Sequence, residues 1–220
     1  MNDFIVAIDG PAGSGKSSIS KMVSKICRFT HIDTGAIFRA ITLYALDKNI
    51  NLENENEYNF LSDIKIRFDK DKVFLNDNDV SHKIREDIIS KNVSAVSKIK
   101  KVRDRVLEIE KESHGKIIMD GRDIGTVVFP NANLKIFLTA SPEERAKRRV
   151  LQNESLGIKS NYDEILADII KRDYKDSTRD IAPLKCADDA INIDTTSLSI
   201  EEVCNKIVNL IDERLRLWKI

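Results

Sequence analysis

The stretch GPAGSGKSS at residues 10–18 constrains this chain most, because it directly follows an apolar run at residues 4–8. It matches the phosphate-binding pattern G-x-x-x-x-G-K-[ST]. Its glycines permit backbone angles that turn several N–H groups toward one anion. Lys16 can reach the β- and γ-phosphates of a nucleotide, and the Ser17 hydroxyl can ligate Mg²⁺. The motif predicts a nucleoside triphosphate site rather than an ordinary glycine-rich turn. The expected binding residues are Gly10, Pro11, Ala12, Gly13, Ser14, Gly15, Lys16, Ser17 and Ser18.

Composition and charge limit the partners that this chain can have. Lys and Arg number 36, as do Asp and Glu, so no global basic field exists for nucleic acid or a membrane surface. No apolar stretch approaches the roughly 20 residues of a membrane span, and no secretory signal pattern is visible. Cys27, Cys186 and Cys204 lack metal-ligand spacing and are typical of reduced thiols. We expect a cytoplasmic monomer that binds neither nucleic acid nor membrane.

Hydrophobic periodicity predicts an α/β fold with a five-stranded parallel sheet flanked by helices. The expected strands begin near residues 4, 29, 116, 134 and 190. The expected helices cover 16–28, 36–48, 84–112 and 162–176, and two more begin near Ser141 and Ser199. Ligands of such sheets gather at the carboxyl ends of the strands. Those ends carry the 10–18 motif, Asp33-Thr34-Gly35 and Asp120-Gly121-Arg122-Asp123, so we expect the chemistry there.

A different pattern interrupts the α/β alternation after residue 48. Residues 49–59 are rich in Asn and Glu, which is typical of a linker. Over 62–82, apolar and polar residues then alternate, with turn-forming residues at 69–71 and 76–79. This pattern predicts a small antiparallel β insertion carried on the α/β core.

Arginines favour a kinase over other phosphate-binding classes. A switch GTPase needs D-x-x-G and N-K-x-D motifs, and neither is found. Transfer to a phosphorylated acceptor needs many positive groups, because both substrates are anionic. The candidates are Arg39, Arg122, the set Arg145, Arg148 and Arg149 on one helical face, and the stripe Arg172, Asp176 and Arg179. Each of the last two groups also fits a solvated helix surface equally well.

Seven motifs together resemble the bacterial cytidylate kinases, a family of nucleoside monophosphate kinases. They are IDGPAGSGKSS (8–18), DTGAIFR (33–39), IRED (84–87), DGRDIGTVVFP (120–130), KIFLTAS with EERAKRR (135–149), RDYKDSTRDIAPL (172–184) and DTTSLSIEEV (194–203). The resemblance covers nearly the whole chain, and its most specific motif is DGRDIGTVVFP. The chain departs from the family at Thr34 and Phe38, where Ser and Tyr are common, but Thr34 keeps the hydroxyl.

The resemblance implies transfer of the γ-phosphoryl group of ATP, with Mg²⁺, to CMP or dCMP. It implies one P-loop kinase domain over 1–220, with its core at 1–50 and 85–220, a monophosphate-binding insertion at about 51–84 and a lid at about 150–162. The implied catalytic residues are Lys16, Arg122 and Arg149, and Arg148 would bind ATP. The implied CMP-binding residues are Thr34, Arg39, Ser94, Arg103, Arg122, Asp123, Arg172, Asp176 and Arg179. We expect His31, His82 and His114 to lie apart from the cluster of motif residues, in surface or packing positions and without a catalytic role.

Ser94 and Arg103 would read the cytosine with Asp123, and this sets a geometric condition. Nine residues turn an ideal helix by about 900°, which points the two side chains to opposite faces. If both touch the base, the helix predicted over 84–112 must break between them, with Ser97 as a plausible new N-cap.

Two other functions stay open from the sequence. The acceptor could be a different small molecule, such as UMP, AMP or shikimate. The chain could also be a regulatory ATP-binding module, but that function leaves the arginines without a role.

Overall fold

The predicted parallel sheet is present in the computed structural model, which describes residues 3–69, 72–155 and 157–218. Among these residues, five strands form one sheet in the order β2-β6-β1-β7-β8. The strands are β1 (Phe4–Asp9), β2 (Thr30–Asp33), β6 (Lys116–Gly121), β7 (Leu134–Thr139) and β8 (Ile191–Asp194). β1 pairs in parallel with β6 and β7, and Asp9 lies opposite Gly121. The segments that follow β1 and β6 therefore start next to each other.

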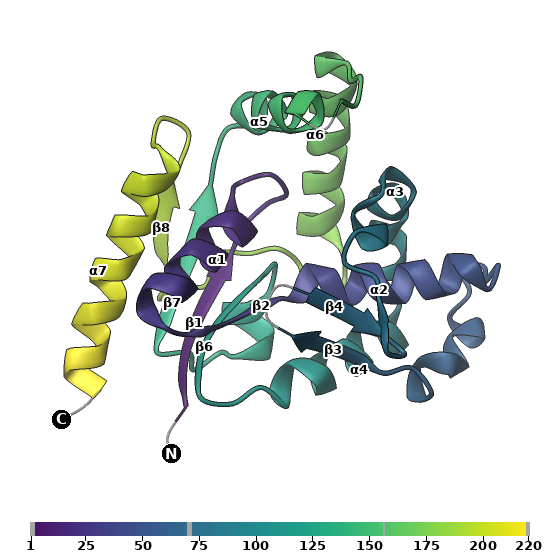
Figure 1. The fold of residues 1–220 in the computed structure, drawn as a ribbon, viewed down its shortest axis with the longest axis horizontal. Helices are drawn as coiled ribbons and strands as arrows, with labels where there is room; N and C mark the ends of the chain where they lie inside the picture. Colours follow the sequence, from purple (N-terminus) through teal and green to yellow (C-terminus); the bar gives the residue numbers. More distant parts are fainter. Residues whose placement is uncertain (1–2, 70–71, 156, 219–220) are drawn as a thin grey trace. The chain divides into compact units, whose positions relative to one another are not determined.

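The chain forms two compact units, residues 1–31 with 114–220, and residues 32–113. The helices of the first unit are α1 (Lys16–Cys27), α5 (Pro142–Ser155), α6 (Tyr162–Thr178) and α7 (Ile200–Trp218), together with a π-helical turn, η3 (Ile124–Val128). α5 packs on α6, and α1 packs on α7 (Figure 1). The apolar faces of α1 and α7 cover the buried side chains of β1, β6 and β7, including Ile8, Ile118 and Ile136.

Two helix starts in the first unit have the predicted caps. The Ser141 hydroxyl accepts the amide of Glu144 at the start of α5. Before α7, the Ser199 hydroxyl accepts the amide of Glu202, whose carboxylate accepts the amide of Ser199 in return. This reciprocal pair is a capping box, which satisfies amides that a helix start leaves unpaired.

The second unit holds the predicted antiparallel strands, β3 (Ile66–Asp69), β4 (Lys72–Leu75) and β5 (Asn78–Asp79), which among the described residues form one sheet. Residues 70 and 71 of the predicted turn lie outside the described residues. The unit's helices are α2 (Thr34–Asp47), α3 (Asp87–Val96) and α4 (Lys100–Lys111), with short segments η1 (Glu55–Ser62) and η2 (Lys83–Arg85). Part of the predicted linker is thus the 3₁₀ segment η1, because Tyr58 is buried there in an apolar core.

The helix predicted over 84–112 is broken, which meets the condition for Ser94 and Arg103 to contact one base. α3 ends at Val96 and α4 begins at Lys100. The prediction that Ser97 is the new N-cap is wrong. Ser97 keeps helical backbone angles as the C-cap of α3, and its hydroxyl donates backward to the Ser94 carbonyl at 3.1 Å. Ile99 occupies the N-cap position of α4, where it offers no side-chain hydrogen bond.

The expected division of the chain into a core, an insertion and a lid stays a prediction. The unit that contains the antiparallel strands is larger than the insertion predicted at 51–84, because it includes α2, α3 and α4. Residue 156 of the predicted lid lies outside the described residues. Among those residues, no helix is both long and apolar enough to cross a membrane.

Candidate active site

The P-loop connects β1 to α1 by a turn that only glycine allows at several positions. Gly10, Gly13 and Gly15 have φ values of 149°, 79° and 90°. A Cβ atom at Gly10 would also collide with the carbonyl oxygen of Leu138 on β7. Gly15 is the N-cap of α1, and no side chain caps the helix there. The start of α1 therefore keeps its amides and its positive dipole end for an anion.

Lys16 is the first residue of α1, and its ammonium group is buried. The side chain is folded back so that Nζ donates to the Pro11 carbonyl at 2.6 Å and to the Ser14 hydroxyl at 3.3 Å. Burial, and then the charge of Arg122, hold the pKa of Lys16 well below its usual value, while Asp120 and Asp9 act in the opposite direction. A cation in such surroundings is stabilised by any anion that approaches it.

Asp9 ends β1, and its buried carboxylate binds the segment that follows β6. Oδ1 accepts the amide of Ile124 at 2.9 Å, and Oδ2 accepts the amide of Gly125 at 2.7 Å. Burial raises the pKa of Asp9 to about 6, and the two amides oppose that rise. The contact joins the strand that leads into the P-loop to the turn that follows Arg122 and Asp123.

Three side chains from α1, β6 and β2 form a chain of hydrogen bonds beside the P-loop. Ser17 Oγ donates to Asp120 Oδ2 at 2.8 Å, and His31 Nε2 lies 2.6 Å from Asp120 Oδ1. The prediction that His31 lies apart from the motif residues is wrong. No motif covers His31, but its position two residues before Asp33 on β2 places it at the carboxyl end of the sheet. The proton of the Ser17 hydroxyl is engaged with Asp120, which leaves the oxygen lone pairs available to a hard cation.

The predicted arginine stripe on α6 meets the segment after β6. Arg122 Nε donates to Asp176 Oδ2 at 3.1 Å, and Arg172 Nε lies 3.9 Å from the same oxygen. Among the described residues, Arg172 Nε makes no hydrogen bond. Burial, and then Arg122, lower the pKa of Arg172 to about 10. The alternative of a solvated surface pair does not hold here, because Asp176 is only 5% exposed.

Beside this group, Arg179 lies 3.5 Å from Asp123. Three guanidinium groups thus face two carboxylates within the first unit. A group of guanidinium donors of this kind is suited to an anionic ligand.

The three arginines of α5 have different roles from one another. Arg145 is 3% exposed and binds the Ala12 carbonyl of the P-loop at 2.9 Å and both carboxylate oxygens of Asp173. Arg148 binds the carbonyl and hydroxyl of Thr195, and Arg149 binds Gln152. Arg145 therefore connects α5 and α6 to the P-loop. The spacing of the three arginines along the sequence does not predict this difference in their contacts.

In the second unit, Arg39 and Asp33 attach α2 to the segment 84–90. Arg39 donates to Ser90 Oγ at 2.8 Å and to the Ile84 carbonyl at 3.2 Å. Asp33 caps α2 by accepting the amide of Ala36, and it pairs with Arg85 at 2.6 Å. The next residue, Thr34, is buried.

The break between α3 and α4 decides where Arg103 lies. Its guanidinium donates to the Ser97 carbonyl at 3.2 Å and lies 5.5 Å from the centre of the Phe38 ring. Ser94 is on the last turn of α3, on the other side of the break. That both residues reach one base stays a prediction.

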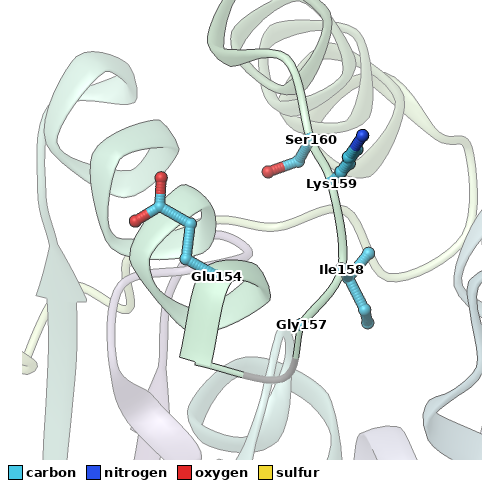
Figure 2. A pocket seen from close by; sticks show the side chains of 5 residues that line it. All are labelled: Glu154, Gly157, Ile158, Lys159 and Ser160. Atoms are coloured by element: carbon cyan, nitrogen blue, oxygen red, sulfur yellow. The ribbon is translucent and has the colours of Figure 1, made fainter.

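A shallow pocket lies in the connection between α5 and α6. It is lined by Glu154, Gly157, Ile158, Lys159 and Ser160. Figure 2 shows Glu154 on the last turn of α5 and Ser160 on the loop that faces it. The pocket contains no residue of the P-loop or of the arginine cluster, so it belongs to the predicted lid and not to the phosphate site.

The parallel sheet, the P-loop and the arginine cluster define a P-loop kinase type of nucleotide-binding protein. The sequence model of the cytidylate kinase family matches residues 6–213 of this chain. The chain therefore belongs to the cytidylate kinase family.

Curated relatives match this chain over nearly their full length. The cytidylate kinase of Fusobacterium nucleatum is 51% identical over 97% of this chain and 99% of its own. That of the onion yellows phytoplasma is 48% identical over 98% and 99%. A solved structure of an uncharacterized protein from Eubacterium ventriosum has 14% identity and a TM-score of 0.53, covering 96% of this chain and 99% of its own, and supports the fold alone.

Asp9 predicts a specific dependence of stability on pH. Its folded-state pKa, about 6, lies above the ordinary 3.8, so the folded protein keeps a proton that the unfolded chain releases. The contribution of Asp9 to the free energy of unfolding therefore falls as the pH rises from about 4 to 6. Relative to an Asp9→Asn variant, the wild type should lose about 2 kcal/mol between pH 4.5 and 7, measured by urea unfolding.

The matched control is Asp194→Asn. The Thr196 hydroxyl and amide lower the pKa of Asp194, so the wild type should gain stability over that variant as the pH rises. A stability difference between wild type and Asp9→Asn that does not change with pH would contradict this view of Asp9.

Proposed function

We propose that this chain transfers the γ-phosphoryl group of ATP to CMP or dCMP, giving ADP and CDP or dCDP. Family membership and the names of its relatives support the reaction. The structural observation that carries the proposal is a cluster of three arginines. Arg122 directly follows β6, Arg172 lies on α6 and Arg179 directly follows α6. A hydrolase has no phosphorylated acceptor, so it needs fewer guanidinium groups than a kinase that acts on one.

The P-loop is proposed to bind the ATP phosphates. Backbone amides of residues 10–18 and the N-terminus of α1 face the anion, and Lys16 exchanges its contacts with Pro11 and Ser14 for the β- and γ-phosphates. Ser17 is proposed to hold Mg²⁺ through a hydroxyl oxygen whose proton is engaged with Asp120. Bound Mg²⁺ would supply positive charge to the phosphate oxygens. Arg148, which Thr195 holds next to the P-loop, is proposed to bind ATP as well.

The acceptor is proposed to use separate groups of residues for its phosphate, its sugar and its base. Arg39 and Arg122 would bind its phosphate. Thr34, five residues before Arg39, is also proposed to contact the acceptor. Arg172 and Asp176 would bind the sugar, and Arg179 would also face the acceptor. Asp123, Ser94 and Arg103 would read the cytosine. Asp and Ser can accept a hydrogen bond from its amino group, and Arg can donate to N3 and O2. Uracil presents a carbonyl where cytosine has the amino group, so a uracil base leaves a carboxylate without a donor.

Transfer needs no protein nucleophile or general base, because the acceptor phosphate is already anionic. Lys16, Arg122 and Arg149 are proposed to neutralise the charge that spreads over the transferring group. The segment 150–162 is proposed as a lid whose closure excludes water, which would otherwise compete as acceptor.

We further propose that the protein acts as a cytoplasmic monomer without nucleic acid or membrane partners. The equal numbers of acidic and basic residues support this. Its three cysteines, which are free thiols in the structure, suit a reducing compartment.

The direct test of the reaction measures ADP formation from ATP with Mg²⁺ while CMP, dCMP, UMP, AMP, dTMP and GMP are supplied one at a time. Of these monophosphates, only CMP and dCMP should stimulate ADP formation strongly. Stimulation by a different monophosphate would overturn the assignment of the base-reading residues. No stimulation by any of them would favour a regulatory ATP-binding module.

Arg122→Ala separates the acceptor site from the donor site. The variant should lose about 3 kcal/mol in kcat/KM for CMP, on the order of a hundredfold, because it removes one charged partner of the acceptor phosphate. Binding of β,γ-methylene-ATP, measured by calorimetry, should change little. Arg214→Ala on the exposed side of α7 is the control and should match the wild type. An equal loss of nucleotide binding in Arg122→Ala would place Arg122 in the donor site.

A further inference from the structure

His31 stands at the end of a chain of hydrogen bonds that reaches the P-loop. It lies on β2, the neighbour of β6 in the sheet, and contacts Asp120 on β6. Asp120 in turn accepts the hydroxyl of Ser17 on α1. The chain therefore crosses three elements of the first unit and ends at the hydroxyl proposed to hold Mg²⁺. None of the phosphate-binding motifs includes His31.

The proton positions follow from what each group can donate. An ionised carboxylate only accepts, so the 2.6 Å contact assigns the proton to His31 Nε2 and the acceptor role to Asp120 Oδ1. The other oxygen, Oδ2, then accepts from Ser17 Oγ at 2.8 Å. Asp120 is 2% exposed, so water cannot readily replace either partner.

We propose that His31 is a positioning residue: it holds the Asp120 carboxylate so that Oδ2 faces Ser17, and thereby keeps the Ser17 oxygen directed at the cation that accompanies ATP. The proposal rests on the proposed role of Ser17. It assigns His31 no contact with substrate.

The physical reason is the freedom of an aspartate side chain. Rotation about its terminal torsion is broad, so each hydrogen bond that the carboxylate accepts restricts its orientation. Without the His31 hydrogen bond, the Asp120 carboxylate has more freedom to turn away from Ser17, so the Ser17 oxygen is held less firmly toward the cation. Residues that orient metal ligands in this way typically change metal affinity by 10- to 100-fold when they are replaced.

The test measures binding of β,γ-methylene-ATP by calorimetry, once with excess Mg²⁺ and once with EDTA. His31→Leu should weaken binding about tenfold with Mg²⁺ and leave binding in EDTA nearly unchanged. His31→Gln, whose amide nitrogen can replace Nε2 as donor, should recover most of the loss. His31→Asn, whose amide is too short to reach Oδ1, should behave like His31→Leu and serves if the apolar variant does not fold.

His114→Leu is the matched control. His114 also contacts an aspartate, Asp3, at 3.1 Å, but it precedes β6, at the opposite end of that strand from Asp120. This variant should bind like the wild type under both conditions.

Two results would overturn the proposal. One is that His31→Leu and His31→Asn keep the Mg²⁺-dependent gain in affinity of the wild type. The other is an equal loss of affinity with Mg²⁺ and with EDTA, which would indicate a general disturbance of the P-loop. Ser17→Ala distinguishes the two levels of the argument: if that variant keeps the Mg²⁺-dependent gain, the proposed role of Ser17 fails, and not only that of His31.

Discussion

Asp9 ends β1 with a buried carboxylate, and both of its oxygens accept amides from the turn that follows β6. The P-loop starts at the next residue, and Arg122 and Asp123 immediately precede the amides that Asp9 binds. One side chain therefore ties the P-loop strand to the segment that carries Arg122 and Asp123. Burial opposes this contact by raising the pKa of Asp9, and the amides and the charge of Lys16 favour it. The parallel register of β1 and β6 brings the two segments close enough for the contact.

Around Asp9 the protein gathers several positive side chains, Lys16, Arg122 and Arg172, close to buried carboxylates. The pKa values of Lys16 and Arg172 are both lowered, mainly by burial and next by Arg122. Such groups cost free energy in the protein alone, and an anion that enters the site relieves that cost. The same positive charge that destabilises the unliganded site is thus expected to stabilise bound phosphates. This arrangement fits phosphoryl transfer, in which charge and alignment supply most of the catalysis.

Local patterns predicted most of the fold, because the buried strands and amphipathic helices are visible as apolar periodicity and the P-loop as a motif. The arginine stripe of α6 was predictable from its helical spacing, and only the structure shows that Asp176 is buried against Arg122. His31 and Arg145 could not be placed in the same way. His31 acts across two neighbouring strands, and Arg145 binds a carbonyl 133 residues away, so neither contact follows from spacing along one element. Ser97 failed as an N-cap because a serine within a helical turn can also bind backward to a carbonyl.

We propose that this site moves a phosphoryl group directly from one bound phosphate to another by alignment and charge, without an attack by a protein side chain. The most direct test uses ATP made chiral at the γ-phosphorus with three oxygen isotopes, and determines the configuration of that phosphorus in the CDP product. A single in-line transfer predicts inversion. Retention would contradict the account, because it requires two successive transfers through a phosphorylated side chain.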